Sequence, residues 1–262
     1  MGNLTAIGRV FYGVSIAALG VLTIAHQDFP YMLIPPRHSW INSYELLLYI
    51  PGALLILAGA CIAIKKWIMP VSLLLGAVLL LIFLFYFGPY EIIGSANFMH
   101  FYDWENALKE LTFAGGAFVI AGCYPQENKN LLIRMLTTLI PLGRILYSLT
   151  IISYGISHFL YAREAADYIP GWIPYHLFWM YIAGLGLLAS GIAILLKIKM
   201  RLAAVLLGAM IFIWVIILHL PKAIAAPIED KGGEVTSGFL ALAYCGIAFV
   251  IAGEAKRTAR TS

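Results

Sequence analysis

Charged side chains are scarce in this 262-residue chain: Asp, Glu, Lys and Arg make up 11% of it, whereas 62% is hydrophobic. About 25% of the residues of a soluble globular domain are charged, so the composition excludes that class. The only cysteines are Cys61, Cys123 and Cys245, which predict no disulfide framework. The sequence also has no Gly-rich phosphate loop, Ser-centred nucleophile elbow, Cys-x-x-Cys pair or His-Glu-x-x-His motif. These catalytic classes therefore have no support.

The chain has long apolar runs in place of charge, and about 20 apolar residues suffice for a helix to cross a bilayer. The runs lie at about 5–25, 44–64, 68–88, 106–123, 142–162, 175–197, 201–220 and 236–253. Each run is too long and too uniformly apolar for a barrel strand. The sequence predicts an all-α polytopic membrane protein with eight transmembrane helices.

The distribution of basic residues predicts the orientation of these helices. Twelve of the seventeen basic residues fall on the side that holds both termini: Arg9, Lys65, Lys66, Lys129, Arg134, Arg144, Lys197, Lys199, Arg201, Lys256, Arg257 and Arg260. Of the thirteen acidic residues, only Glu127 and Glu254 join them. By the positive-inside rule, both termini are cytoplasmic, and a bacterial inner membrane is the expected location. The net charge of +4 is then a topology signal, and we expect no nucleic-acid partner.

An internal repeat organises the chain. Gly8–Gly20 (GRVFYGVSIAALG) matches Gly143–Gly155 (GRILYSLTIISYG), and Ala117–Gly122 recurs letter for letter at Ala248–Gly253. Four spans in each unit make the repeats parallel. The repeat predicts two tandem four-helix bundles: residues 1–125, a cytoplasmic linker at 126–135, and residues 136–262.

The second half carries motifs that resemble the DoxX-like membrane family. They are Leu-Gly-Arg at 142–144, Gly-Ile-Ser-His-Phe at 155–159, Trp-Ile-Pro-Tyr-His-Leu-Phe-Trp at 172–179 and His-Leu-Pro-Lys at 219–222. The first half enters the resemblance only through the repeat. The resemblance implies a four-helix bundle and proximity to redox membrane complexes, one of which is a thiosulfate:quinone oxidoreductase. Other members of the family look like chaperones or cargo receptors.

Three histidines are the strongest candidates for chemistry. His158, His176 and His219 stand near the predicted outer ends of three adjacent helices, where the first half has Thr23, Tyr44 and Phe87. Neutral imidazoles suit zinc, copper or iron, and they are costly in apolar surroundings without a partner. We therefore expect at least two of the three to share a ligand or a hydrogen-bond network. A bis-histidine haem is disfavoured because the histidines lie at one depth.

Several side chains near these histidines could orient them. The expected supporting residues are Tyr154, Tyr161, Glu164, Asp167, Trp172 and Trp179. The alternative is that His176 and His219 simply lie at the membrane interface, with the tryptophans in an aromatic belt.

The first half has its own polar set near the outer face, formed by His26, Glu45, His100, Lys109 and Glu110. Lys109 and Glu110 fall within the first turns of a span, so an internal ion pair with Glu45 is expected. Structural pairing is the main interpretation, and a proton relay is the alternative.

Three function hypotheses follow. The chain is a metal-binding or quinone-linked redox subunit, a non-enzymatic scaffold or chaperone that binds a membrane or extracytoplasmic partner, or a binder of a lipid or other apolar small molecule. The sequence does not decide between them, nor whether the protein is an enzyme.

The topology is directly testable. A reporter fused after Arg260 should lie in the cytoplasm, because both termini fall on the basic side of the membrane. Its activity or protection from an external label measures this, and an extracytoplasmic reporter would contradict the orientation.

Overall fold

The computed structural model describes residues 3–26, 46–94, 101–125 and 130–261, and all regular structure in these ranges is helical. The long helices are α1 (Asn3–His26), α2 (Leu46–Ala63), α3 (Ile68–Ile82), α4 (Phe101–Cys123), α6 (Ile140–Leu160), α8 (His176–Leu195), α9 (Met200–Trp214) and α11 (Ile228–Thr261). Short segments complete the order: η2 (Phe83–Phe87), η3 (Tyr90–Gly94), α5 (Leu131–Leu136), η4 (Thr137–Leu139), α7 (Ala162–Ala166), η5 (Val215–His219) and α10 (Leu220–Ala225). The expected linker at 126–135 is helical from Leu131 onward, and 126–129 lie outside the described residues.

Six stretches of the described chain are long and apolar enough to cross a membrane. They are Asn3–His26, Ile68–Ile93, Leu131–Leu160, His176–Leu195, Met200–Ala225 and Gly232–Ala255. Large apolar side chains such as Leu57, Phe85 and Leu206 are more than half exposed on their outer surfaces, as expected of contact with lipid. These six helices fit an integral membrane protein.

Two of the eight expected spans fall outside this set for different reasons. The described apolar part of α2, Tyr49–Ala63, is shorter than the six. Helix α4 carries Glu105, Lys109 and Glu110, which make it less apolar. It is nevertheless the most enclosed helix, since every residue from Thr112 to Ala121 is buried. Protein, rather than lipid, surrounds its polar side chains.

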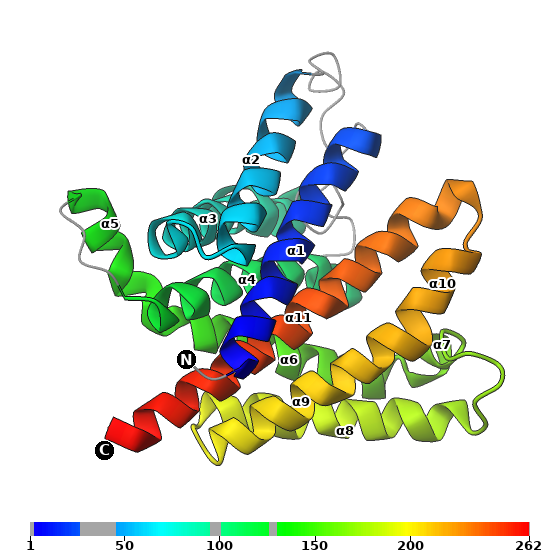
Figure 1. Cartoon of the computed structure of the whole chain (residues 1–262). Coiled ribbons are helices and arrows are strands. Elements are labelled where there is room, and N and C mark those ends of the chain that lie inside the picture. The colour runs from blue at the N-terminus through cyan, green and yellow to red at the C-terminus, as the bar shows by residue number, and fades with distance from the viewer. Residues whose placement is uncertain (1–2, 27–45, 95–100, 126–129, 262) are drawn as a thin grey trace.

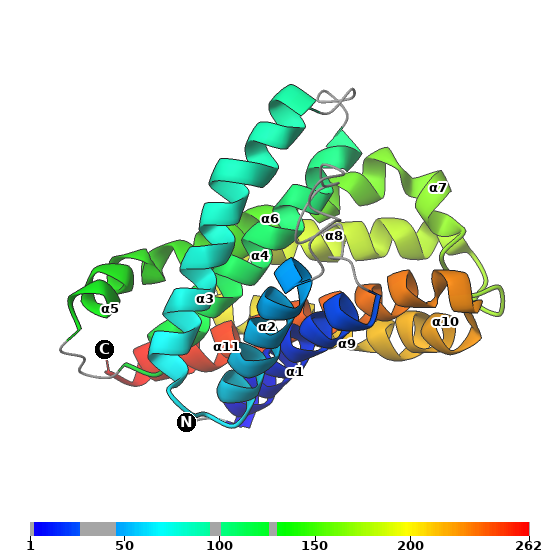
Figure 2. The ribbon, with the colours of Figure 1, turned by 90° about the horizontal axis from the view of Figure 1, so that it is seen from above.

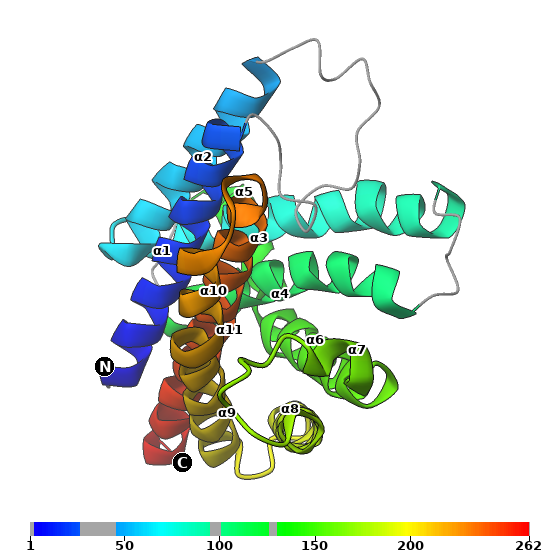
Figure 3. The same ribbon diagram turned by 90° about the vertical axis from the view of Figure 1, so that its right-hand side faces the viewer.

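The long helices interlock between the two halves of the chain. Helix α1 packs along α2 and also along α11, and α4 packs along α3 and also along α6. Figures 1 and 3 show α11 running beside α1 although the two are at opposite ends of the sequence. The contacts therefore do not show the expected pair of separate bundles, because the first and last helices of each half pack extensively against the other half as well as against their own.

Glycines allow the close approach at these two junctions. A Cβ atom on Gly246 of α11 would lie 2.6 Å from the Gly8 carbonyl oxygen of α1. A Cβ atom on Gly115 of α4 would lie 2.7 Å from the Gly143 carbonyl oxygen of α6. Apolar side chains gain little by leaving lipid for a helix interface, so membrane helices associate through such small-residue contacts.

Contacts within each half use corresponding positions of the sequence match. The buried Tyr12 hydroxyl donates to the Phe113 carbonyl at 2.6 Å, and the buried Tyr147 hydroxyl donates to the Tyr244 carbonyl at 2.9 Å. Similarly, Gly76 packs against the ring of Phe118, and Gly208 against the ring of Phe249. The identical Ala117–Gly122 and Ala248–Gly253 segments lie on α4 and α11, which also contact each other (Figure 2).

The two halves also share a backbone feature that proline produces in α3 and α9. Helices α3 and α9 each end in a π-helical segment, η2 and η5, two residues before Pro89 and Pro221. Proline clashes with the carbonyl four residues earlier, and a π turn moves that carbonyl away. The N–H groups of Gly88 and Leu220 accordingly donate to carbonyls five residues back, those of Phe83 and Val215.

Helix α1 begins, and α11 ends, at the same end of the molecule (Figures 1 and 3). This arrangement is compatible with both termini on one side of a membrane. A tight turn with left-handed residues at Lys65 and Trp67 joins α2 to α3. A second one, with left-handed residues at Lys197 and Lys199, joins α8 to α9.

Gly246→Ala should destabilise the protein by about 1–3 kcal/mol, because its methyl group would meet the α1 backbone. Gly233→Ala in the same helix is the matched control, since nothing lies within 4 Å of its Cβ position. It should stay within about 0.5 kcal/mol of wild type. Unfolding in mild detergent measures both, and equal stabilities of the two variants would contradict the packing at this junction.

Candidate functional site

A cavity of about 330 Å³ lies among α6, α8, α9 and α11, with one side chain contributed by α4. Its lining residues are Lys109, Ile151, Tyr154, His158, Ala165, Tyr168, Ile169, Met180, Ala183, Leu187, Met210, Ile211, Trp214, Leu218, His219, Ser237, Leu240, Ala241 and Tyr244. All but Lys109 come from the second half of the chain. The cavity is thus placed where the sequence predicts the histidine site.

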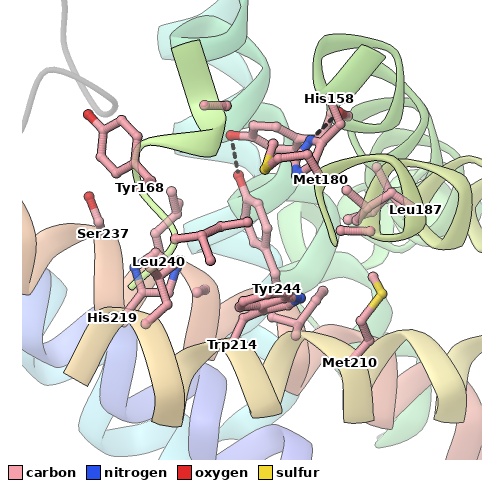
Figure 4. A pocket seen from close by; sticks show the side chains of 18 of the residues that line it. His158, Tyr168, Met180, Leu187, Met210, Trp214, His219, Ser237, Leu240 and Tyr244 are labelled. Atoms are coloured by element: carbon pink, nitrogen blue, oxygen red, sulfur yellow. Dashed lines mark hydrogen bonds between the residues drawn. The ribbon is translucent and has the colours of Figure 1, made fainter. Parts of the chain in front are cut away.

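The walls are mostly apolar. Met180 and Leu187 of α8 and Met210 of α9 line the cavity together with Trp214 and Leu240 (Figure 4). Methionine is flexible and polarisable, so it adapts to the shape of an apolar ligand. The side chains of Ala183 and Ala241 are small, so they leave space in the cavity unfilled.

His158 and two tyrosines form the hydrogen-bonded polar group of the cavity. The His158 Nδ1 atom lies 2.8 Å from the Tyr154 carbonyl oxygen. A carbonyl only accepts, so Nδ1 carries the proton and neutral His158 presents Nε2 as an acceptor. The hydroxyls of Tyr154 and Tyr244 lie 3.4 Å apart, and their rings are in contact with centroids 5.8 Å apart. This pair links α6 to α11 beside the cavity.

His219 reaches the same cavity from a different wall. It is the last residue of the π-helical segment η5, immediately before Leu220 and Pro221. In Figure 4, His158 and His219 lie on different sides of the cavity, with Tyr244 and Leu240 drawn between them. A ligand in the cavity would therefore meet the two imidazoles at separate points.

His176 does not belong to the group that lines the cavity. It is the first residue of α8 and is half-buried. Within the described residues, no group of three or more His, Cys, Asp and Glu side chains is placed to hold a metal ion. The three-histidine metal site therefore has no support in the described residues. His176 shares the helical face of Met180 and Ala183, but it is the first residue of α8 and is not among the lining residues.

Of the residues expected to support the histidines, only part lies at the cavity. Tyr154 lines the cavity, whereas Tyr161, Glu164, Asp167, Trp172 and Trp179 do not. Glu164 and Asp167 are exposed, and Trp172 is 71% exposed. Exposed aromatic side chains near helix ends suit the membrane interface.

The first-half polar set does not form one cluster in the described residues. Lys109 lines the second-half cavity, where its ammonium donates to Asn106 Oδ1 at 2.7 Å. The ring of His26 lies against Gly232 at the start of α11. Glu110 is fully buried, and neither of its carboxylate oxygens has a hydrogen-bond partner among the described residues. Glu45 and His100, including the expected Lys109–Glu45 pair, lie outside the described residues.

Some site residues are absent from the sequence hypothesis. Glu105 accepts a hydrogen bond from Ser157 and so joins α4 to α6 beside the cavity. Tyr168, Ser237 and Tyr244 line the cavity itself. The helical spacing of Glu105 and Lys109 is visible in the sequence, but it does not reveal that α4 packs on α6.

Comparison with protein-family models gave no match, and no curated protein and no solved structure matches the chain. The cavity and its residues therefore carry the functional argument, and the DoxX-like resemblance stays a prediction from the motifs of the second half.

Proposed function

We propose that this chain is an integral membrane protein whose second half binds a small, mainly apolar molecule with one polar end. The observation that carries the proposal is the cavity itself, about 330 Å³ in volume and lined mostly by apolar side chains. This is the apolar-ligand hypothesis of the sequence analysis, placed at the site expected for the histidines.

The chemistry of the lining supports this class of ligand. Small-molecule sites have volumes of about 300–1,000 Å³ and mainly apolar walls, with a few polar groups that fix orientation. Here the polar groups are His158, Tyr154, Tyr244, His219 and Lys109. A quinone belongs to the class, because its carbonyl oxygens could accept from such donors while its tail remains apolar. The quinone-linked redox hypothesis is therefore one case of this proposal.

We further propose the membrane arrangement expected from the sequence. Counting α2 and α4 with the six apolar helices would give eight spans, with both termini in the cytoplasm of a bacterial cell. The corresponding contacts of Tyr12 and Tyr147 favour a tandem repeat in which the halves share α4 and α11 at their interface. A DoxX-like relationship would account for the motifs in the second half.

Photolabelling tests the ligand site. Dodecanol that carries a diazirine on its alkyl chain should label the cavity-lining segments of α8 and α9 saturably in phosphatidylcholine nanodiscs. Peptide mass spectrometry locates the label, and unlabelled dodecanol should compete for it. Labelling from the bilayer at lipid-facing positions should not saturate.

A pair of substitutions on α8 provides the control. Ala183→Phe places a ring in the cavity and should abolish saturable labelling. Leu185 does not line the cavity and is 58% exposed, so Leu185→Phe should leave the labelling unchanged. Absence of saturable labelling in the wild type would overturn the proposed function.

A further inference from the structure

The charges on the residues that line the cavity are all of one sign. Among the lining residues, Lys109 is the one with a permanent charge, and no Asp or Glu side chain is present. His158 and His219 are neutral or positive according to pH, and the tyrosines are neutral. A ligand in the cavity therefore meets positive or neutral groups.

The Lys109 ammonium has spare donor capacity. One of its three N–H groups is used by Asn106 at 2.7 Å, and within the described residues no carboxylate forms an ion pair with it. Glu105, one turn earlier on α4, attracts the Lys109 ammonium electrostatically, but it accepts from Ser157 and is not a lining residue. The N–H groups of Lys109 that Asn106 does not use are therefore available to an anionic ligand in the cavity.

A second ammonium lies at the mouth of the cavity. Lys222 Nζ is 3.8 Å from the centroid of the Tyr168 ring, and Tyr168 both lines the cavity and is 56% exposed. Two cations that come from different halves of the sequence thus flank the same space.

We propose that the ligand is a single-chain amphiphile with an anionic head, bound with its head at Lys109 and its tail along the methionine-lined wall. This inference rests on the proposed function and specifies its ligand class. A head that carries a carboxylate or a phosphate satisfies the same ammonium. The cavity volume, at the low end of the range for ligand sites, suits one chain rather than a two-chain lipid.

Competition against photoreactive dodecanol tests the head group. Dodecanoate and dodecyl phosphate should compete at about tenfold lower concentration than dodecanol, as expected for a hydrogen bond to a charged group. Dodecyltrimethylammonium should compete more weakly than dodecanol. The stronger of the two anions identifies the head, and equal competition by dodecanol and both anions in wild-type protein would overturn the inference.

Substitution identifies the cation. Lys109→Met should remove the advantage of the anions over dodecanol, measured as the ratio of their competing concentrations within each variant. Lys66→Met changes an exposed lysine in the turn between α2 and α3 and should keep the advantage. Lys109→Gln serves where the methionine variant does not fold. An anion preference that survives loss of Lys109 contradicts the assignment, whereas absence of saturable labelling by any probe contradicts the proposed function instead.

Discussion

Backbone contact at glycine is the constraint on which this structure depends. In a bilayer, helices do not gain the free energy of leaving water, so they must associate through close packing and polar contacts. The Gly8–Gly246 and Gly115–Gly143 contacts bring helix backbones from the two halves of the chain together. The hydrogen bonds of Tyr12 and Tyr147 lie beside these contacts and fix the register of the helices. The cavity walls are then set by helices that cannot slide.

Much of the fold can be predicted from the sequence, since apolar length and repetition are local properties. The apolar runs coincide with the helices, and the matching segments around Gly8 and Gly143 predict corresponding contacts. The interlocked packing could not be predicted this way. Nothing in the spacing of Glu105 and Lys109 shows that α4 lies against α6 as well as against α3 of its own half. The burial of α4 is a tertiary property.

The candidate site could be predicted only in part, for a similar reason. Depth along a helix follows from residue number, so the sequence places His158 and His219 near the same end of the second half, and both line the cavity. The extent of the cavity along α8 does not follow: His176 shares the face of Met180 but lies one turn earlier, and it is not among the lining residues. Lys109 reaches the cavity from a helix that is distant in sequence. The repeat does not extend to these charged side chains, since Lys109 and Glu110 match the apolar Leu240 and Ala241 of the second half.

The pairing of α1 with α11 has a consequence for how the protein is made. The ribosome delivers α1 first and α11 last, so the Gly8 face of α1 has no partner until the whole chain has entered the membrane. Contacts between such distant segments form late, because closing a long loop costs entropy before the contact stabilises it. Completion of the fold therefore waits for the last helix, and a nascent chain that stalls before α11 exposes a glycine-rich surface within the bilayer. The interlocked arrangement makes correct assembly depend on the full length of the polypeptide.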